Sequence, residues 1–132
     1  MKLSAPEIAG NLIQNLWSRW LIRVPYAGKY ASLVNKRGGK IVLDHVAFRT
    51  INAHTGEQPG GIMGIQHIFD YLGYRTAGKY IFPHKKLSAI HMEHPVKYLP
   101  KVFISHVESD RLPSWAGQMI RNEVRDTPYL LT

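Results

Sequence analysis

The order of the apolar segments in the middle of the chain constrains its fold more than any other feature. Residues 40–50 are rich in β-branched and aromatic side chains and contain no Gly or Pro, so they predict a strand with both faces mostly buried. A helical pattern over 62–72 follows. Three more strand patterns then occupy 74–82, 87–93 and 101–107, with prolines at the breaks between them. This βαβββ order predicts an α+β fold built on one four-stranded sheet.

A sheet with its helix on one side needs a second cover for the opposite face. Three covers fit the pattern: the N-terminal helix, a second copy of the module, or chain beyond these residues. No internal repeat is visible within the 132 residues that would supply the second module.

Helical patterns flank the predicted module on both sides. Apolar side chains recur at helical spacing over 7–24, and Pro25 should end that helix because it disfavours a helical residue before it. A second short helix is expected over 29–36. The last helical pattern covers 112–124, with the candidate N-caps Asp110 and Ser114.

The length and composition are those of one globular domain. A chain of 132 residues with 45% hydrophobic and 20% charged residues can bury a single core. We therefore expect one domain over 1–132, made of an N-terminal helical segment (1–39), the βαβββ module (40–107) and a C-terminal helix with a tail (108–132).

Several classes of protein are excluded by what the sequence lacks. It has no cysteine, so disulfides, thiolate metal sites and cysteine nucleophiles are ruled out. No stretch approaches the roughly 20 apolar residues of a membrane-spanning helix, and the N-terminus has no hydrophobic signal core. We expect no membrane association and a cytoplasmic location. The glycines fit no phosphate loop, and no nucleophile elbow is present.

The charge balance favours an anionic partner. Lys and Arg number 17 against 9 Asp and Glu, which gives a net charge of +8 with neutral histidines. The basic residues are scattered, and their densest clusters are only Lys36-Arg37 and Lys85-Lys86. The candidate partners are nucleic acid, an acidic membrane, and a small carboxylate or phosphate, and the scatter argues against nucleic acid. A non-catalytic basic module that binds anionic ligands or nucleic acid remains the alternative function.

The first predicted strand carries the strongest candidate site. Alternation places His45, Ala47 and Arg49 on one face of the strand. An imidazole can ligate a metal ion, and a nearby guanidinium can grip a carboxylate in a fork, so the pair suits a metal-chelated anionic substrate. The structural alternative is a partly buried histidine beside an arginine that pairs with a surface carboxylate.

Further imidazoles and carboxylates follow in the third and fourth predicted strands, namely His91, Glu93, His94 and His106. Two histidines and one carboxylate with open positions are typical of non-haem Fe(II) oxygenases, and such ligands also suit Mn or Zn. His91 and His94 can equally be surface residues beside turns. A metal site requires that side chains from separate strands converge on one ion, which depends on how the strands pair.

Three segments, taken together and in this order, resemble a known family. They are Asp44-His-Val-Ala-Phe-Arg-Thr50, Lys85-Lys-Leu-Ser-Ala-Ile-His-Met-Glu-His-Pro95 and Pro100-Lys-Val-Phe-Ile-Ser105. The chain is similar to the first module of the 2-oxoadipate dioxygenase/decarboxylase family, within the glyoxalase-like, vicinal oxygen chelate superfamily. The likeness runs from the first helix to about residue 124.

The resemblance implies an oxidoreductase: a mononuclear Fe(II) dioxygenase that converts 2-oxoadipate and O2 to 2-hydroxyglutarate in lysine degradation. His45 matches the family's first metal-binding histidine, and Arg49 matches the arginine that holds the substrate carboxylate. His106 stands where the family has Glu and is a further candidate ligand. The family's second metal histidine and metal glutamate lie in a later module, and no residue here matches them. The resemblance therefore implies a half-site completed by a homodimer or a second module, or an incomplete member.

Overall fold

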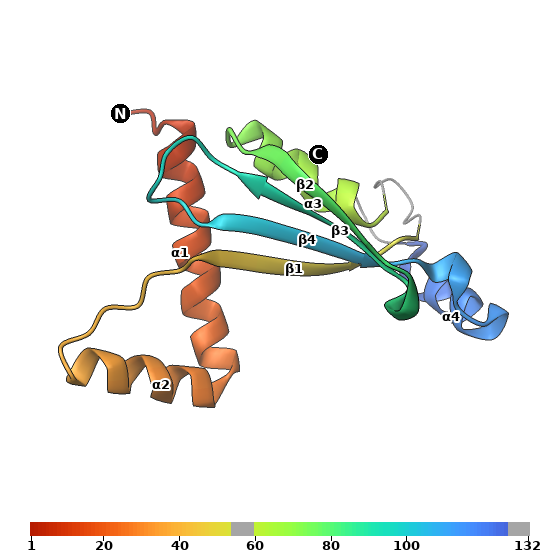
Figure 1. The fold of residues 1–132 in the computed structure, drawn as a ribbon, viewed down its shortest axis with the longest axis horizontal. Coiled ribbons are helices and arrows are strands. Elements are labelled where there is room, and N and C mark those ends of the chain that lie inside the picture. Colours follow the sequence, from red (N-terminus) through yellow and green to blue (C-terminus); the bar gives the residue numbers. More distant parts are fainter. Residues whose placement is uncertain (54–59, 127–132) are drawn as a thin grey trace.

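The middle of the chain forms a four-stranded sheet in the computed structural model, which describes residues 1–53 and 60–126 (Figure 1). The strand order is β1-β4-β3-β2; β1 runs parallel to β4, and the other neighbours are antiparallel. A helix, α3, connects β1 to β2. These elements are β1 (His45–Ile51), α3 (Ile62–Tyr71), β2 (Arg75–Phe82), β3 (Leu87–Glu93) and β4 (Lys101–Val107). The predicted βαβββ order and α+β class are confirmed.

The remaining helices are α1 (Ala5–Arg23), α2 (Pro25–Lys36) and α4 (Ser114–Val124). Ser4 and Glu7 form a capping box at the start of α1, with the Ser4 backbone N–H donating to the Glu7 carboxylate at 2.8 Å. Pro25 ends α1 as predicted, but it also opens α2 at the first helical position, where its missing N–H is harmless. Consequently α2 begins at Pro25 and not at residue 29.

The start of α4 differs from the expected capping. Its N-cap is Pro113, and Asp110 lies in a short 3-10 helix (Ser109–Arg111). Neither predicted cap residue therefore occupies the N-cap. The predicted tail after residue 126 and the part of the predicted loop at 54–59 lie outside the described residues.

Both α1 and α3 pack on the same face of the sheet, behind the strands in the view of Figure 1. Their contributions to the core include Ala9 and Ile13 from α1 and Phe69 from α3, which join Val102 and Ile104 of β4. The N-terminal helix thus extends the cover that α3 provides. Within residues 1–53 and 60–126, no element covers the second face of the sheet.

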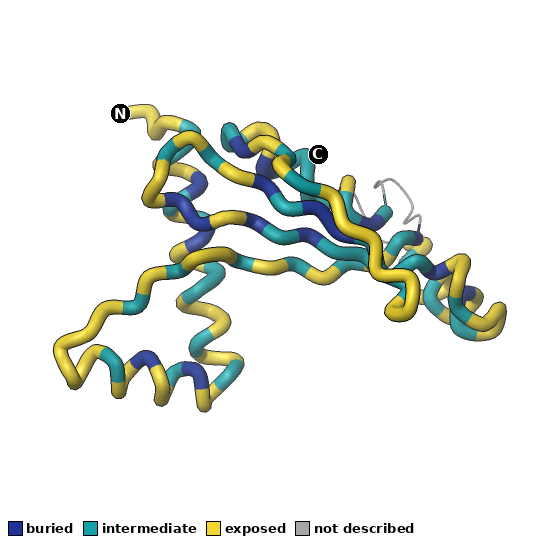
Figure 2. Tube along the Cα trace, viewed as in Figure 1, coloured by how far each residue is buried: buried dark blue, intermediate teal, exposed yellow. Residues whose placement is uncertain are grey.

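The first strand shows the consequence of this one-sided cover. Its residues alternate between exposed and half-buried, with Val46 and Phe48 packed against the core. The prediction that both faces of this strand are mostly buried is wrong, because β1 is an edge strand and no described element covers its other face. Figure 2 shows β1 alternating between exposed and intermediate residues and β2 continuously exposed over its last residues, 79–82; these are the two outer strands. Residues 40–44 precede the strand and are not part of it.

Among the described residues, no helix combines the length and the apolarity needed to cross a membrane.

Candidate functional site

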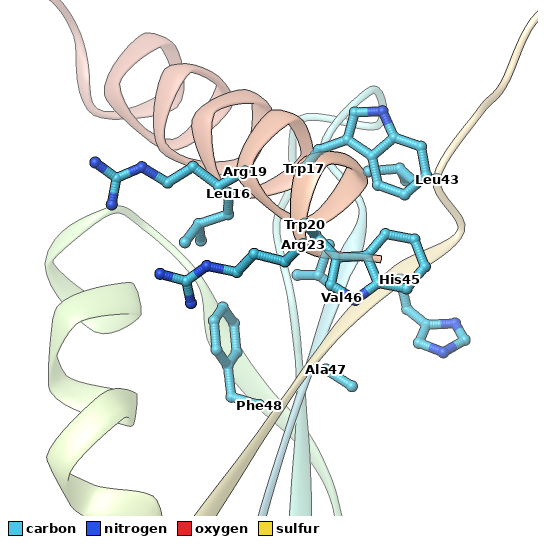
Figure 3. Close-up of a pocket in the computed structure, with 10 residues that line it drawn as sticks. All are labelled: Leu16, Trp17, Arg19, Trp20, Arg23, Leu43, His45, Val46, Ala47 and Phe48. Atoms are coloured by element: carbon cyan, nitrogen blue, oxygen red, sulfur yellow. The ribbon is translucent and has the colours of Figure 1, made fainter. Parts of the chain in front are cut away.

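The open face of the sheet carries the predicted His45 and Arg49. In the parallel register, Ala47 lies opposite Phe103 and Arg49 opposite Ser105, so these side chains share one face. Figure 3 shows His45 and Ala47 leaving β1 on one side, and Val46 and Phe48 on the other. The predicted alternation is therefore present, and it places the imidazole and the guanidinium on the uncovered side.

A carboxylate orients the His45 ring. Its Nδ1 lies 3.0 Å from Asp44 Oδ2, and this hydrogen bond is the main cause that lowers the pKa of Asp44. An ionised carboxylate can only accept, so Nδ1 carries the proton and the lone pair of His45 is on Nε2. Metal-ligating histidines characteristically donate their second ring N–H in this way. The side chain is 51% exposed, so Nε2 is open to a ligand.

A row of four rings crosses all four strands on the open face. The His45 and Phe103 ring centroids lie 5.2 Å apart, Phe103 stacks on His91 at 5.2 Å, and the Tyr80 hydroxyl lies 2.8 Å from His91 Nδ1. Gly78 leaves room for this row, because a Cβ there would lie 2.7 Å from ring atoms of His91. Phe103 stands between the two imidazoles, so His45 and His91 do not converge on one ion.

A hollow of about 310 Å³ opens beside this row. Polar groups in its lining are His45, Arg49, Lys85 and Ser105, and no Asp or Glu lines it. Arg49 and Lys85 form no hydrogen bond or ion pair with the residues that the structure describes. A lining with cationic groups and no carboxylate favours an anionic ligand.

A second hollow of about 540 Å³ lies between α1 and β1 (Figure 3). Trp17 and Trp20 stack in its wall with centroids 5.4 Å apart. The guanidinium groups of Arg19 and Arg23 point away from His45 in Figure 3, so this hollow does not join the imidazole to a cation.

His106 lies on the opposite side of the sheet from His45. It pairs with Thr50 in the register and is 15% exposed beneath the start of α3. Its Nδ1 accepts the backbone N–H of Ile62 at 3.1 Å, and its Nε2 lies 3.0 Å from Glu108 Oε1. The structure thus does not bring the two predicted ligands, His45 and His106, together. The side chain of His106 points to the covered face of the sheet, and both of its ring nitrogens have hydrogen-bond partners.

Glu108 gathers three donors at the end of β4. Besides His106, the Asn52 amide donates to it at 3.0 Å and the Ser88 hydroxyl at 2.8 Å. These hydrogen bonds lower the pKa of Glu108 to about 2, and the bond from Asn52 makes the largest contribution. The cluster ties β1, β3 and β4 together, which is a structural role.

The histidine beside the β3–β4 turn also has a structural role. His94 Nε2 donates to the Leu72 carbonyl at 3.1 Å, and its Nδ1 accepts the Val96 N–H at 3.0 Å. The ring packs edge-on against buried Tyr74, whose pKa is raised to about 12 by desolvation. His94 therefore fastens the turn to the core.

No three His, Asp or Glu side chains within residues 1–53 and 60–126 are grouped so that they could hold a metal ion. Of the described residues on the open face, His45 is the one whose geometry fits metal ligation. One such imidazole does not by itself make a metal site, since bound metals in proteins take three or more protein ligands.

The same architecture occurs in solved structures of other proteins. A protein of Ralstonia eutropha JMP134 described as a glyoxalase superfamily member superposes with a TM-score of 0.92 over 99% of this chain, at 27% identity. The fold is that of a glyoxalase-like module. A hydroxyglutarate synthase from Oryza sativa, solved in complex with 2-oxoadipate, matches 92% of the chain at 29% identity and a TM-score of 0.80.

A third match is a protein of Shewanella frigidimarina NCIMB 400 described as a hydrolase, with 32% identity over 86% of this chain and a TM-score of 0.75. The present chain spans 42%, 43% and 41% of the Ralstonia, Shewanella and Oryza chains, so it corresponds to less than half of each. No family model and no curated protein sequence matches it.

The Glu108 cluster predicts an acid-sensitive contribution to stability. Glu108→Gln should lower the free energy of unfolding at pH 7 by about 1–3 kcal/mol, because three donors lose a charged acceptor. The folded pKa of about 2 lies below the ordinary 4.5, so the wild-type advantage is complete above about pH 4.5 and is lost as the pH falls toward 2. Urea unfolding at several pH values measures both effects.

Glu123→Gln on the exposed face of α4 is the matched control for this measurement. A Glu108→Gln protein as stable as that control at pH 7 would contradict the structural role of the cluster.

Proposed function

We propose that this chain is one module of a metal-dependent enzyme that acts on a 2-oxo dicarboxylic acid. The proposed reaction is the conversion of 2-oxoadipate and O2 to 2-hydroxyglutarate and CO2. The observation that carries the proposal is the placement of His45 and Arg49 on one open face, beside a hollow that no Asp or Glu lines. A hydroxyglutarate synthase with 2-oxoadipate bound shares the fold, which supports this choice of substrate.

His45 is the residue that would hold the metal ion. The hydrogen bond to Asp44 fixes the tautomer and the orientation of the His45 ring. In this tautomer and orientation, Nε2 is available to a ligand on the open face. Fe(II) is the proposed ion, with Mn or Zn as the alternatives that an imidazole also suits. When bound, such an ion supplies Lewis acidity toward a 2-oxo acid, and iron also supplies electrons for O2 chemistry.

Arg49 orients the substrate through a carboxylate. Its guanidinium offers a fork of N–H donors with no partner among the described residues, and it lies on the strand that carries His45. The apolar Phe103 and Ala89 also line the hollow, beside the charged groups.

The remaining metal ligands come from a second module in this proposal. The open face shows rings and aliphatic groups, including Ile51 and Phe82, that another sheet would cover. A second copy of this chain in a homodimer, or a second module of a longer chain, would bring its ligands opposite His45. Measurement of mass in solution separates a dimer from a monomer.

Metal affinity tests the role assigned to His45. After loading with Fe(II) under anaerobic conditions, the wild-type chain should retain iron and His45→Ala should lose it. Asp44→Ala should weaken binding about 10–100-fold, because the carboxylate that orients the imidazole is gone. Metal analysis after gel filtration gives the occupancies.

His84→Ala is the control, since His84 is an exposed histidine on the turn after β2. Equal iron retention by wild type and by all three variants would show that His45 is not a ligand.

Substrate affinity tests the role assigned to Arg49. Arg49→Ala should weaken 2-oxoadipate binding by about 10–100-fold, the range expected for a charged hydrogen bond of about 1.5–3 kcal/mol. The melting temperature should not change, because the side chain is exposed. Calorimetric titration measures the affinity, with Arg37→Ala at the end of α2 as the control. Unchanged affinity in Arg49→Ala would refute the role.

A further inference from the structure

We propose that Lys85 acts with Arg49 to bind the carboxylate at the tail of the substrate, and so selects 2-oxo dicarboxylic acids over 2-oxo monocarboxylic acids. This inference rests on the proposed function and assigns a specificity-determining residue within it. Lys85 and Arg49 line the same hollow, although they are distant in the sequence.

The backbone holds Lys85 in place at the edge of the open face. It ends the short 3-10 helix Pro83–Lys85 between β2 and β3, where Lys86 is left-handed with φ 53°. The Lys86 N–H donates to the Pro83 carbonyl at 3.1 Å, and the Glu108 N–H donates to the Lys86 carbonyl at 2.7 Å. The turn is therefore fastened to the end of β4, which restricts where the Lys85 ammonium can reach.

The length of the site fits an extended acid with a charge at each end. Positions 45 and 49 on one strand are separated by about 13 Å between Cα atoms, at about 3.3 Å per residue. A 2-oxo head beside His45 therefore leaves room for several methylene groups before the tail meets Arg49. Apolar Leu87, Ala89 and Phe103 line the hollow against such a chain.

Charge complementarity points to a carboxylate at the Arg49 end. Two cationic side chains without described partners face a hollow that no Asp or Glu lines. Ser105, directly opposite Arg49 in the register, adds a hydroxyl donor on the same face. A monocarboxylic 2-oxo acid would set a methyl group against these donors and leave both cations unpaired, which disfavours it.

The test compares two acids of equal length on two lysine variants. Anaerobic calorimetry with the Fe(II)-loaded chain measures binding of 2-oxoadipate and of 2-oxohexanoate, which has a methyl group in place of the tail carboxylate. The wild type should prefer 2-oxoadipate by at least about tenfold, a difference of about 1.4 kcal/mol. Lys85→Gln should lose most of this preference without a change in 2-oxohexanoate affinity. Lys86→Gln, of equal charge change on the same turn, should retain it.

The outcomes separate this inference from the proposed function. If Lys85→Gln keeps the full preference while Arg49→Ala and His45→Ala still weaken 2-oxoadipate binding, the assignment to Lys85 is overturned and the proposed function stands. If neither 2-oxo acid binds the wild type, the proposed function fails. A metal-free NMR titration with adipate then decides the subsite alone: binding that Lys85→Gln weakens and Lys86→Gln does not supports it, and equal binding overturns it.

Discussion

The parallel pairing of β1 with β4 determines which face of the sheet carries the candidate site residues of these two strands. The register sets Ala47 against Phe103 and Arg49 against Ser105, and the alternation of side chains then puts His45 on the same face. On the other face, Val46 and Val102 are opposite each other in the core. A shift of one residue would bury the imidazole and the guanidinium and expose the apolar set, so the core that fixes the register also fixes the site.

Asymmetric cover of the sheet links the fold to the proposed chemistry. Two helices, α1 and α3, stabilise one face by burying apolar side chains, and the face left free carries the ring row and the cation-lined hollow. The glyoxalase-like neighbours are more than twice as long as this chain. A second module over the open face is therefore the arrangement in which the proposed ligand His45 would meet further ligands.

Much of the fold was predictable from local sequence, and the reasons are specific. The bounds of β3 and β4 agree with the prediction, because turn residues and prolines flank short apolar runs. The same locality explains the errors. Nothing near Pro25 distinguishes a helix end from the start of the next helix, and the burial of β1 depends on whether another element covers it.

The site was predictable only in part. The alternation of side chains along a strand shows which residues share a face, but it does not show which face another element covers. His45 and Arg49 share a strand, so their common face followed from alternation alone. Whether His106 shares that face depends on the β1–β4 register, which no local pattern encodes. The sequence did not identify Lys85, Phe103 and Tyr80 as site residues, because the turn and the strand pairing bring them to the open face. For Phe103, the alternation within 101–107 was a partial signal, since it places Phe103 and Ser105 on the same face of the strand.

The most direct test of this account is to locate the ligand-binding face in solution. Mn(II) added together with 2-oxoadipate broadens the amide NMR signals of residues near the ion. The account predicts that the strongest broadening falls on β1 around His45 and on β4 around Phe103, with the signals of α3 little affected. Broadening centred on the start of α3 near Ile62, or no localised broadening, would contradict it.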